Sequence, residues 1–563
     1  MVAKTFQGLE DVLRDELIEL GAENVELGLR MVSFEGDNEI LYRANLCCRT
    51  ALRILKPIVM FTADSTDELY DHVRELDWEE FLNPDSTFSI DSTVNGPEFT
   101  HSKFATYRVK DGIVDHFYDK YGKRPSIRLS GADVQLNVHI SDNRVTISLD
   151  SSGEPLYKRG YRVGQTEAPI NEVLAAGIIL KTGWRGESDF IDPMCGSGTF
   201  LVEAALIACN INPGIYRDHF AFEKWPDFDS ELFEEIYNDD SGERDFAYTI
   251  YGGDIDADAV AIARKNVKSA RVEDNVKIER KDVGDWVDNA PEGIMVTNPP
   301  YGERLKPENI SILYNKIGST LKKYFKGWHA WIIGYREDQF SEIGLKPSVK
   351  IPLHNGSLEC SLREYVMFDG KYSEFKADGG IIKEKDGLQG PKKVKRISDD
   401  EWEKEAGKFN RSGGMKPKDK RKFNRDDRKP LRRDDDRDFR RDDRKPLRRD
   451  DDRDFRRDDR KPFRRDNDRD FRRDDRKPFR RDNDRDFRRD DRKPFRRDDD
   501  RGFRHDDRKP FRRDERSVSG SRSSELKIPA KSKGPSLPED SQTIINPVHM
   551  RSRKNRNQDS YDE

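Results

Sequence analysis

Two rhythms of apolar and polar residues divide the chain, and the change falls near residue 165. In the first part, apolar residues at three- and four-residue spacing predict an N-terminal amphipathic helix. The residues concerned are Leu9, Val12, Leu13, Leu17 and Leu20. Later runs alternate with a period of two and predict strands at 87–94, 134–140 and 144–150, the last two forming a hairpin around the turn SDN. This region is therefore predicted to be α+β with an antiparallel sheet.

From about residue 166 to 370, strand-like and helix-like runs alternate. The predicted strands are 189–192, 248–254, 276–280, 293–298 and 330–335. The predicted helices are 199–209, 257–270 and 310–325. Such alternation is typical of a parallel sheet with helices on both faces. Residues 349–368 then place an Asn-Gly turn between two extended runs, which predicts an antiparallel hairpin at the end of the sheet.

The last third of the chain has no such rhythm. The pentapeptide DDRKP recurs six times with a period of 16 residues, over about 421–516. One repeat, 446–461, carries seven basic and six acidic side chains but only one Leu and one Phe. Because it has almost nothing apolar to bury, we expect residues 376–563 to be disordered. Two uses remain open: a solubilising linker, or an Arg- and Phe-rich arm that contacts RNA phosphates and stacks on bases.

The charge is divided in the same way. Residues 1–400 hold 49 Lys and Arg against 69 Asp and Glu, a net −20, whereas residues 401–563 hold 56 against 41, a net +15. A polyanionic partner must therefore be bound by local patches or by the tail. Five scattered cysteines have no metal-ligand spacing, so we expect no metal and a reducing compartment. Without a signal peptide or an apolar run of 18 residues, we expect a cytoplasmic protein and no membrane partner.

Polar groups follow four consecutive predicted strands. The first strand runs into a glycine turn with Gly196 and Gly198, but residue 201 is Leu and no phosphate-binding lysine follows, which favours a nucleoside ligand without a pyrophosphate. Asp254 ends the second strand and is placed to accept ribose hydroxyls. Asp282 follows the third and could accept from an adenine amine, although a loop aspartate is often only a turn former.

The fourth strand ends in VTNPPYGERL, residues 296–305. Two prolines stop the strand and hold Asn298 and Tyr301 on a stiff backbone. In an open α/β sheet, ligands bind in the crevice at the carboxyl ends of the strands. We therefore expect the glycine turn, both aspartates and Asn298 to share one site. The alternative is a buried Asn and an ordinary Tyr after a proline turn.

In this order, the motifs DPMCGSGT, GGDID, KD and NPPYGERL resemble class I S-adenosylmethionine-dependent methyltransferases. More narrowly, residues 157–184 followed by DPMCGSGTFLVEAAL resemble the THUMP-domain RNA methyltransferases, in particular the N-terminal guanine-N2 methyltransferase half of the bacterial large-subunit rRNA enzymes. The resemblance covers about residues 1–370. Relatives can carry a second methyltransferase unit, but here the repeat tail stands in its place, so the second activity is not implied.

The resemblance implies a fold and a domain order. It implies a ferredoxin-like segment at 1–42, a THUMP RNA-binding domain at 43–155 and a Rossmann-like methyltransferase domain at 156–375. It places Pro169, Asp192, Cys195 and Thr199 around S-adenosylmethionine, together with the glycines, both aspartates and Asn298 named above. The RNA face would include Lys103, Arg108, Lys110, Arg159 and Arg162, although scattered basic residues are usually solvated surface.

The resemblance also implies how the proline corner works. The Asn298 side-chain oxygen and the Pro299 carbonyl would accept the two N–H groups of an exocyclic base amine, Pro300 would keep the corner rigid, and Tyr301 would stack on the target base. The expected reaction is guanine-N2 methylation of 23S rRNA, free or in the pre-ribosomal large subunit. Guanine-N2 methylation of tRNA, adenine-N6 methylation, and a non-catalytic RNA-binding role in ribosome assembly are the alternatives.

Overall fold

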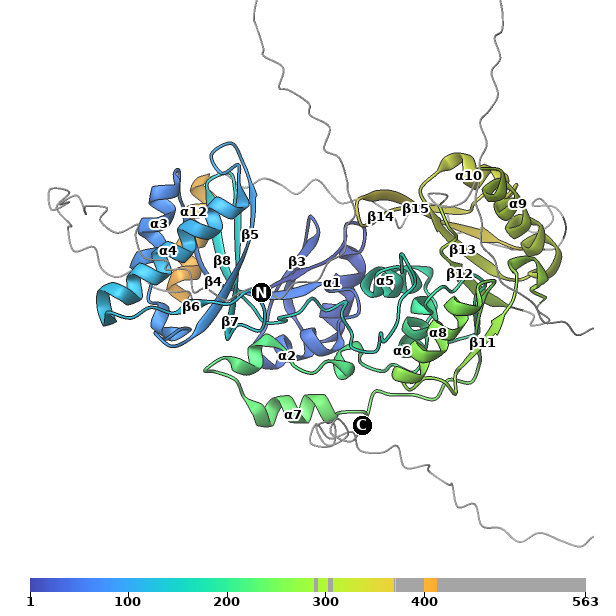
Figure 1. The fold of residues 1–563 in the computed structure, drawn as a ribbon, viewed down its shortest axis with the longest axis horizontal. Helices are drawn as coiled ribbons and strands as arrows, with labels where there is room; N and C mark the ends of the chain where they lie inside the picture. The colour runs from blue at the N-terminus through green and yellow to red at the C-terminus, as the bar shows by residue number, and fades with distance from the viewer. Residues whose placement is uncertain (288–291, 302–306, 369, 371–398, 413–563) are drawn as a thin grey trace, which may run out of the picture. The chain divides into compact units, whose positions relative to one another are not determined.

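The computed structural model describes residues 1–287, 292–301, 307–368, 370 and 399–412. These residues form an eight-stranded and a seven-stranded sheet with their helices (Figure 1). Disorder was predicted for residues 376–563, and of these only 399–412 are among the described residues.

The seven-stranded sheet has the predicted doubly wound form with an antiparallel end. Its strands are β9 (Asp189–Asp192), β10 (Ile250–Asp254), β11 (Val276–Arg280), β12 (Gly293–Thr297), β13 (His329–Gly334), β14 (Val349–Asn355) and β15 (Leu358–Val366). Their order is β11-β10-β9-β12-β13-β15-β14, parallel as far as β13 and antiparallel through the terminal hairpin. Since β9 lies between β10 and β12, the chain changes direction across the sheet beside β9, and a crevice is expected at that point.

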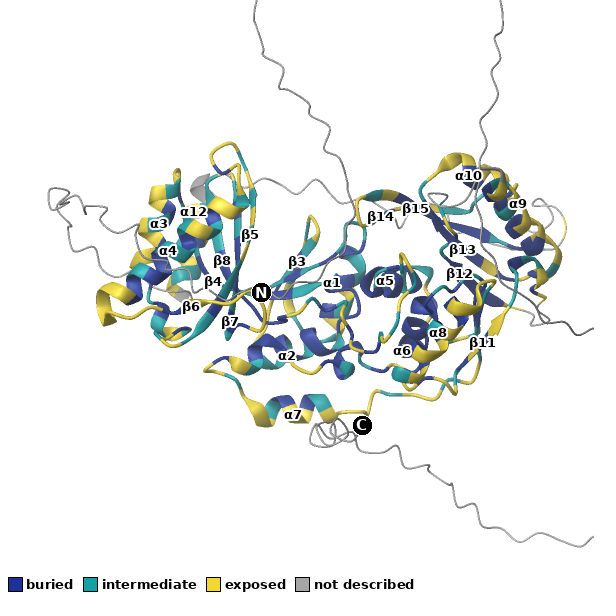
Figure 2. Ribbon diagram, in the orientation of Figure 1, coloured by how far each residue is buried: buried dark blue, intermediate teal, exposed yellow. Residues whose placement is uncertain are grey.

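Helices cover both faces of this sheet, as Figure 1 shows, and Figure 2 shows its central strands buried between them. The helices are α5 (Glu172–Thr182), α6 (Thr199–Ala208), α8 (Ala257–Ser269), α9 (Pro307–Tyr324) and α10 (Glu337–Glu342). Alternate residues of β12 face opposite cores. Ile294 and Val296 belong to the core that contains α5, α6 and α8, whereas Met295 belongs to the core of α9 and α10.

The N-terminal sheet was predicted to be antiparallel, and this prediction is wrong for one part of it. Its strands are β1 (Val2–Lys4), β2 (Glu23–Gly28), β3 (Met31–Glu35), β4 (Arg53–Thr62), β5 (Thr87–Asn95), β6 (Ser126–Ile127), β7 (Val134–Ser141) and β8 (Arg144–Asp150). The hairpin β7–β8 is confirmed, but β5 pairs in parallel with both β6 and β7. The reason is the crossover helix α4 (Ser102–Tyr121), since parallel neighbours require a long connection of this kind.

Strand β4 belongs to both halves of this sheet, because its first residues pair with β1 and the rest with β8. The other helices here are α1 (Glu10–Glu19), α2 (Asn38–Cys47) and α3 (Thr66–Glu75), so the predicted boundary at residue 43 falls inside α2. Elsewhere lie α7 (Ser230–Asn238) and the 3-10 turns η1 (Trp78–Glu80), η2 (Pro213–Tyr216), η3 (Ala221–Lys224) and η4 (Val283–Asp285). Among the described residues, no helix is both long and apolar enough to cross a bilayer.

One segment of the predicted disordered region is helical: α12 (Asp399–Ser412). Trp402, Ala406 and Phe409, at four- and three-residue spacing, give it an apolar stripe, and Ala406 is buried. The Asn410 side chain accepts the N–H of Met60 and donates to its carbonyl, at 3.2 and 2.7 Å. These two hydrogen bonds attach the helix to β4. The helix was not predicted, because the charged composition of residues 376–563 was interpreted as disorder.

Candidate active site

The carboxyl ends of β9, β10, β11 and β12 meet at one cavity of about 820 Å³. At or after each strand end lies a residue predicted from the sequence, the glycine Gly196 and the polar Asp254, Asp282 and Asn298. The proline corner and the connector before α5 complete this set with Pro299, Pro300, Tyr301 and Pro169. The structure thus places the predicted catalytic residues and five of the predicted cofactor residues around the same space.

The glycine turn after β9 adopts a backbone that suits glycine. Gly196 and Gly198 have φ of 52° and 82°, in the left-handed region, and a Cβ on Gly198 would lie 3.0 Å from the Cβ of Ala263 on α8. The Gly196 N–H donates to Asp254 Oδ2 at 3.0 Å. The Cys195 N–H donates to the carbonyl of Gly253 at 2.8 Å. Two hydrogen bonds therefore hold the turn against the end of β10.

A third hydrogen bond joins the end of β9 to the end of β12, directly before the proline corner. The Thr297 hydroxyl donates to Asp192 Oδ1 at 2.8 Å, so the ends of β12 and β9 are tied together. Asp192 is fully buried, and burial is the main reason that its pKa is raised to about 7. Thr297 directly precedes Asn298, which means that the carboxyl of Asp192 supports the backbone from which Asn298 projects.

The proline corner is held from two sides. The Gln339 side chain, on α10, donates to the carbonyl of Tyr301 at 2.8 Å, and the Tyr301 ring packs edge-on against Tyr335 with centroids 5.4 Å apart. The Tyr301 hydroxyl donates to Asn298 Oδ1 at 2.6 Å. Burial raises the pKa of Tyr301 well above its usual value, so this hydroxyl stays protonated and remains a donor. The motif continues in residues 302–305, which lie outside the described part.

The two predicted aspartates differ in what they contact. Asp254 receives the N–H groups of Gly196 and Asp256, while Asp256 itself caps α8, as suits a residue at that position. Asp282 accepts the N–H of Gly284 at 2.7 Å and pairs with Lys316 of α9 at 3.0 Å. Asp282 therefore forms a turn, and it also lines the cavity.

Several cavity residues were not predicted from the sequence. Ile255 and Ile312 present apolar surface and are 63% and 61% exposed, and Asn355 and Leu358 reach the cavity from the β14–β15 hairpin. The Asn-Gly turn at 355–356 was interpreted only as a hairpin signal. The position of the apolar Ile255 between Asp254 and Asp256 was a usable sequence signal. Apolar walls, carboxylate acceptors and a glycine turn without lysine together suit a nucleoside ligand.

Four residues predicted to contact the cofactor do not line the cavity and instead pack beneath the lining residues: Asp192, Cys195, Gly198 and Thr199. Asp192 and Cys195 are buried, and the Thr199 hydroxyl accepts from Arg162 at 2.9 Å. Their contacts shape the glycine turn and the strand ends. The motif was therefore informative, although only part of it faces the ligand space.

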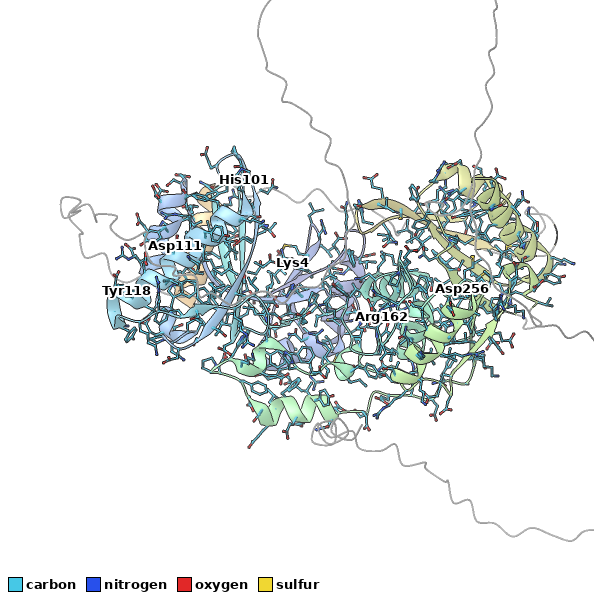
Figure 3. All side chains as sticks on the ribbon, in the orientation of Figure 1. Lys4, His101, Asp111, Tyr118, Arg162 and Asp256 are labelled. Atoms are coloured by element: carbon cyan, nitrogen blue, oxygen red, sulfur yellow. The ribbon has the colours of Figure 1, made fainter. Side chains whose placement is uncertain are left out.

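The structure places the five residues predicted to contact RNA in different environments. Arg159 is 2% exposed and bonds Glu203 and two carbonyls, a placement that does not support an RNA contact. Arg162 bonds Glu172, Ser197 and Thr199 and so braces the glycine turn (Figure 3). On α4, Arg108 pairs with Asp67, Lys110 pairs with Asp111, and Lys103 is exposed. The sequence alone does not show that these basic side chains are bound to partners within the protein.

Comparison with known families divides the chain into three matching regions. Residues 1–55 match the RlmL ferredoxin-like domain, residues 63–150 the THUMP domain, and residues 159–364 the RMKL-like methyltransferase domain. The last region contains every strand of the seven-stranded sheet as far as the first part of β15.

Three similar proteins are named as RNA methyltransferases. A putative RNA methyltransferase of Synechocystis, slr0064, is 37% identical over 65% of this chain and 96% of its own length. The ribosomal RNA large subunit methyltransferases K/L of Syntrophotalea carbinolica and Methylococcus capsulatus are 37% and 36% identical over 65% and 69% of this chain. The chain spans only about half of their length, 53% in each case.

One similar protein has been solved with a ligand bound. The crystal structure of SMU.472, a putative methyltransferase complexed with SAH, is 33% identical, with a TM-score of 0.60, and the match covers 66% of this chain and 98% of that one. Its ligand is the demethylated form of S-adenosylmethionine, a nucleoside without a pyrophosphate, as the glycine turn predicts. The chain therefore belongs to the THUMP-domain family of class I S-adenosylmethionine-dependent RNA methyltransferases, with an RlmL-type ferredoxin-like domain at its N-terminus.

Proposed function

We propose that this enzyme methylates the exocyclic N2 amine of a guanine in 23S rRNA. The observation that carries the proposal is the position of Asn298 at the end of β12, in the same cavity as Gly196 and Asp254. S-adenosylmethionine supplies a methyl group on a sulfonium when bound there. The glycine turn and the carboxylate of Asp254 hold the nucleoside end, so that an amine held at Asn298 lies on the same edge of the sheet.

The amine is a weak nucleophile because its lone pair is delocalised into the ring of the base. The Asn298 side-chain oxygen has two lone pairs, of which one accepts the Tyr301 hydroxyl and the other is free for an amine N–H. The Pro299 carbonyl would accept the second N–H. The two prolines keep both acceptors rigid, which is the positional control that a transfer of this kind needs. The amine releases its proton after transfer, so no general base is required.

The choice of large-subunit RNA is supported by two relatives whose names specify it. The test is a methylation assay on unmodified 23S rRNA with mass analysis of the nucleosides. We expect N2-methylguanine at one position. Product only at adenine, or none on 23S rRNA, contradicts the proposal.

A second candidate is methylation of adenine N6, or of a guanine in tRNA. The adenine target is favoured by one similar structure, named a predicted N6-adenine-specific DNA methylase from Listeria monocytogenes, which is 32% identical with a TM-score of 0.60 over 65% of this chain and 95% of that one. The Asn298 corner would accept either amine. Nucleosides from tRNA and rRNA of a deletion strain separate these targets.

The variant Asn298→Ala tests catalysis against a purely RNA-binding role. It removes the amine acceptor and leaves the surface of the N-terminal sheet unchanged, so we expect RNA binding to persist while methylation falls at least about 100-fold. If rRNA processing in cells that carry this variant is as complete as with the unaltered protein, methylation is not the function under selection.

A further inference from the structure

The C-terminal end of α4 exposes an unusual amount of apolar surface. Tyr118, Tyr121, Ile127 and Leu129 are 58%, 48%, 44% and 91% exposed. Figure 3 marks Tyr118 on this helix, at the far end from His101. We call residues 118–129 the α4 tip. Its backbone is fixed, because Gly122 closes the helix with φ of 63° and β6 pairs with β5 at the edge of the sheet.

The α4 tip is also a basic patch in an acidic body. It contains Lys120, Lys123, Arg124 and Arg128 against one acid, Asp119, a net +3 in a region of net −20. Asp119 is paired with Arg74. Lys120 and Lys123 pair with Glu79 and Asp85 in exposed bridges, which are weak. Among the described residues, Arg124 and Arg128 form no ion pair, and both are exposed.

The two tyrosines are held differently. The Tyr121 ring stacks on the buried Phe117, with centroids 6.0 Å apart, and its hydroxyl donates to Glu79 at 3.3 Å. Tyr118 makes no aromatic or cation–π contact within the described part and is 58% exposed, so much of its ring is open to solvent. The α4 tip therefore combines an exposed aromatic ring, a second ring stacked on Phe117, and two exposed guanidinium groups, of which Arg128 also interacts electrostatically with Asp133.

We propose that the α4 tip binds an unpaired segment of the RNA substrate, with bases stacked on Tyr118 and phosphates at Arg124 and Arg128. This inference rests on the proposed methylation of RNA. It specifies a second place, outside the cavity, at which the RNA substrate is bound. Aromatic rings flanked by cations are how proteins bind single-stranded nucleic acid. Protein-docking surfaces are also enriched in Tyr and Arg, but they are depleted of Lys, of which the α4 tip has two. Duplex RNA offers no base faces for stacking.

The test compares matched variants on a labelled 12-nucleotide single-stranded RNA and on the same sequence within a hairpin stem. Tyr118→Ala should raise the Kd for the single strand at least about fivefold and leave the stem unaffected. Arg124→Ala/Arg128→Ala should flatten the dependence of log K on log salt by roughly 1.4. The controls are Tyr248→Ala, outside the N-terminal sheet and 47% exposed, and Lys265→Ala/Lys268→Ala on α8.

Equal effects of Tyr118→Ala and Tyr248→Ala, or equal loss on stem and single strand, overturn the proposal. Tyr118 is exposed, so an unchanged unfolding temperature confirms that the variant is folded. The proposed function is judged separately, by the methylated nucleoside. If 23S rRNA is not the target but Tyr118→Ala still weakens binding of the single strand, the α4 tip stands and only the target changes.

Discussion

At the scale of single residues, the hydrogen bond between Tyr301 and Asn298 offers a direct test of the corner. The hydroxyl fixes the rotation of the Asn298 amide, and the ring is the expected stacking surface for the base. Tyr301→Phe keeps the ring and loses one hydrogen bond, so kcat should fall about fivefold with little change in KM. Tyr301→Ala should lose a further tenfold or more in kcat/KM. Faster turnover by Tyr301→Phe would instead mean that the hydroxyl competes with the amine.

Asp192 predicts a pH dependence of stability. Its folded pKa is about 7, whereas an aspartate in an unfolded chain titrates near 3.9. Between these values the unfolded chain has lost the proton and the folded chain has kept it, so the free energy of unfolding falls as pH rises through this window and levels off above it. In Asp192→Asn this group cannot titrate. The unfolding free energy of the unaltered protein minus that of the variant should decline by roughly 2–4 kcal/mol from pH 4 to 7.

Urea unfolding at pH 5, 6, 7 and 8 measures this difference. A difference that stays constant with pH would show that Asp192 is ionised in the folded protein at acidic pH. The variant keeps an acceptor for the Thr297 hydroxyl, so the corner remains supported.

At the scale of elements, the end of β10 depends on a close contact with an aromatic ring. A Cβ on Gly253 would lie 2.5 Å from Cζ2 of the buried Trp286. Gly253→Ala should therefore displace the strand end and Asp254 with it, costing about 1–3 kcal/mol of stability and about tenfold in cofactor affinity. Gly122→Ala is the control, because its Cβ meets no atom within 4 Å. It should cost about 1 kcal/mol from its left-handed backbone and leave cofactor affinity unchanged.

Sequence patterns predicted the helices and strands better than they predicted which of these elements pair or meet. The strands of the methyltransferase sheet were predicted to within two residues, because buried strands and amphipathic helices have distinct periods. The parallel pairing of β5 was missed, since alternation within a strand carries no information on the direction of its partner. Ile312 and Asn355 were missed for a related reason: they come from α9 and the terminal hairpin, far in the chain from the motifs that define the site.

At the scale of the whole molecule, an acidic body carries a basic tail, and α12 attaches the start of that tail to the N-terminal sheet. We expect the tail to serve as an RNA-binding arm. A chain that ends after residue 412 keeps α12 but loses a net charge of +15, leaving a body of net −20 to approach a polyanion.

Removing the tail should therefore raise the Kd for 23S rRNA at least about tenfold at low salt, and the difference should narrow as salt screens the charges. Cofactor affinity should not change, because the described residues that line the cavity all precede residue 359. A tail with Lys for every Arg and Leu for every Phe keeps the charge and loses the stacking groups, so it separates the two contributions. Unchanged RNA affinity across the salt range would identify the repeats as a solubilising linker, and the acidic body would then bind RNA through local basic patches alone.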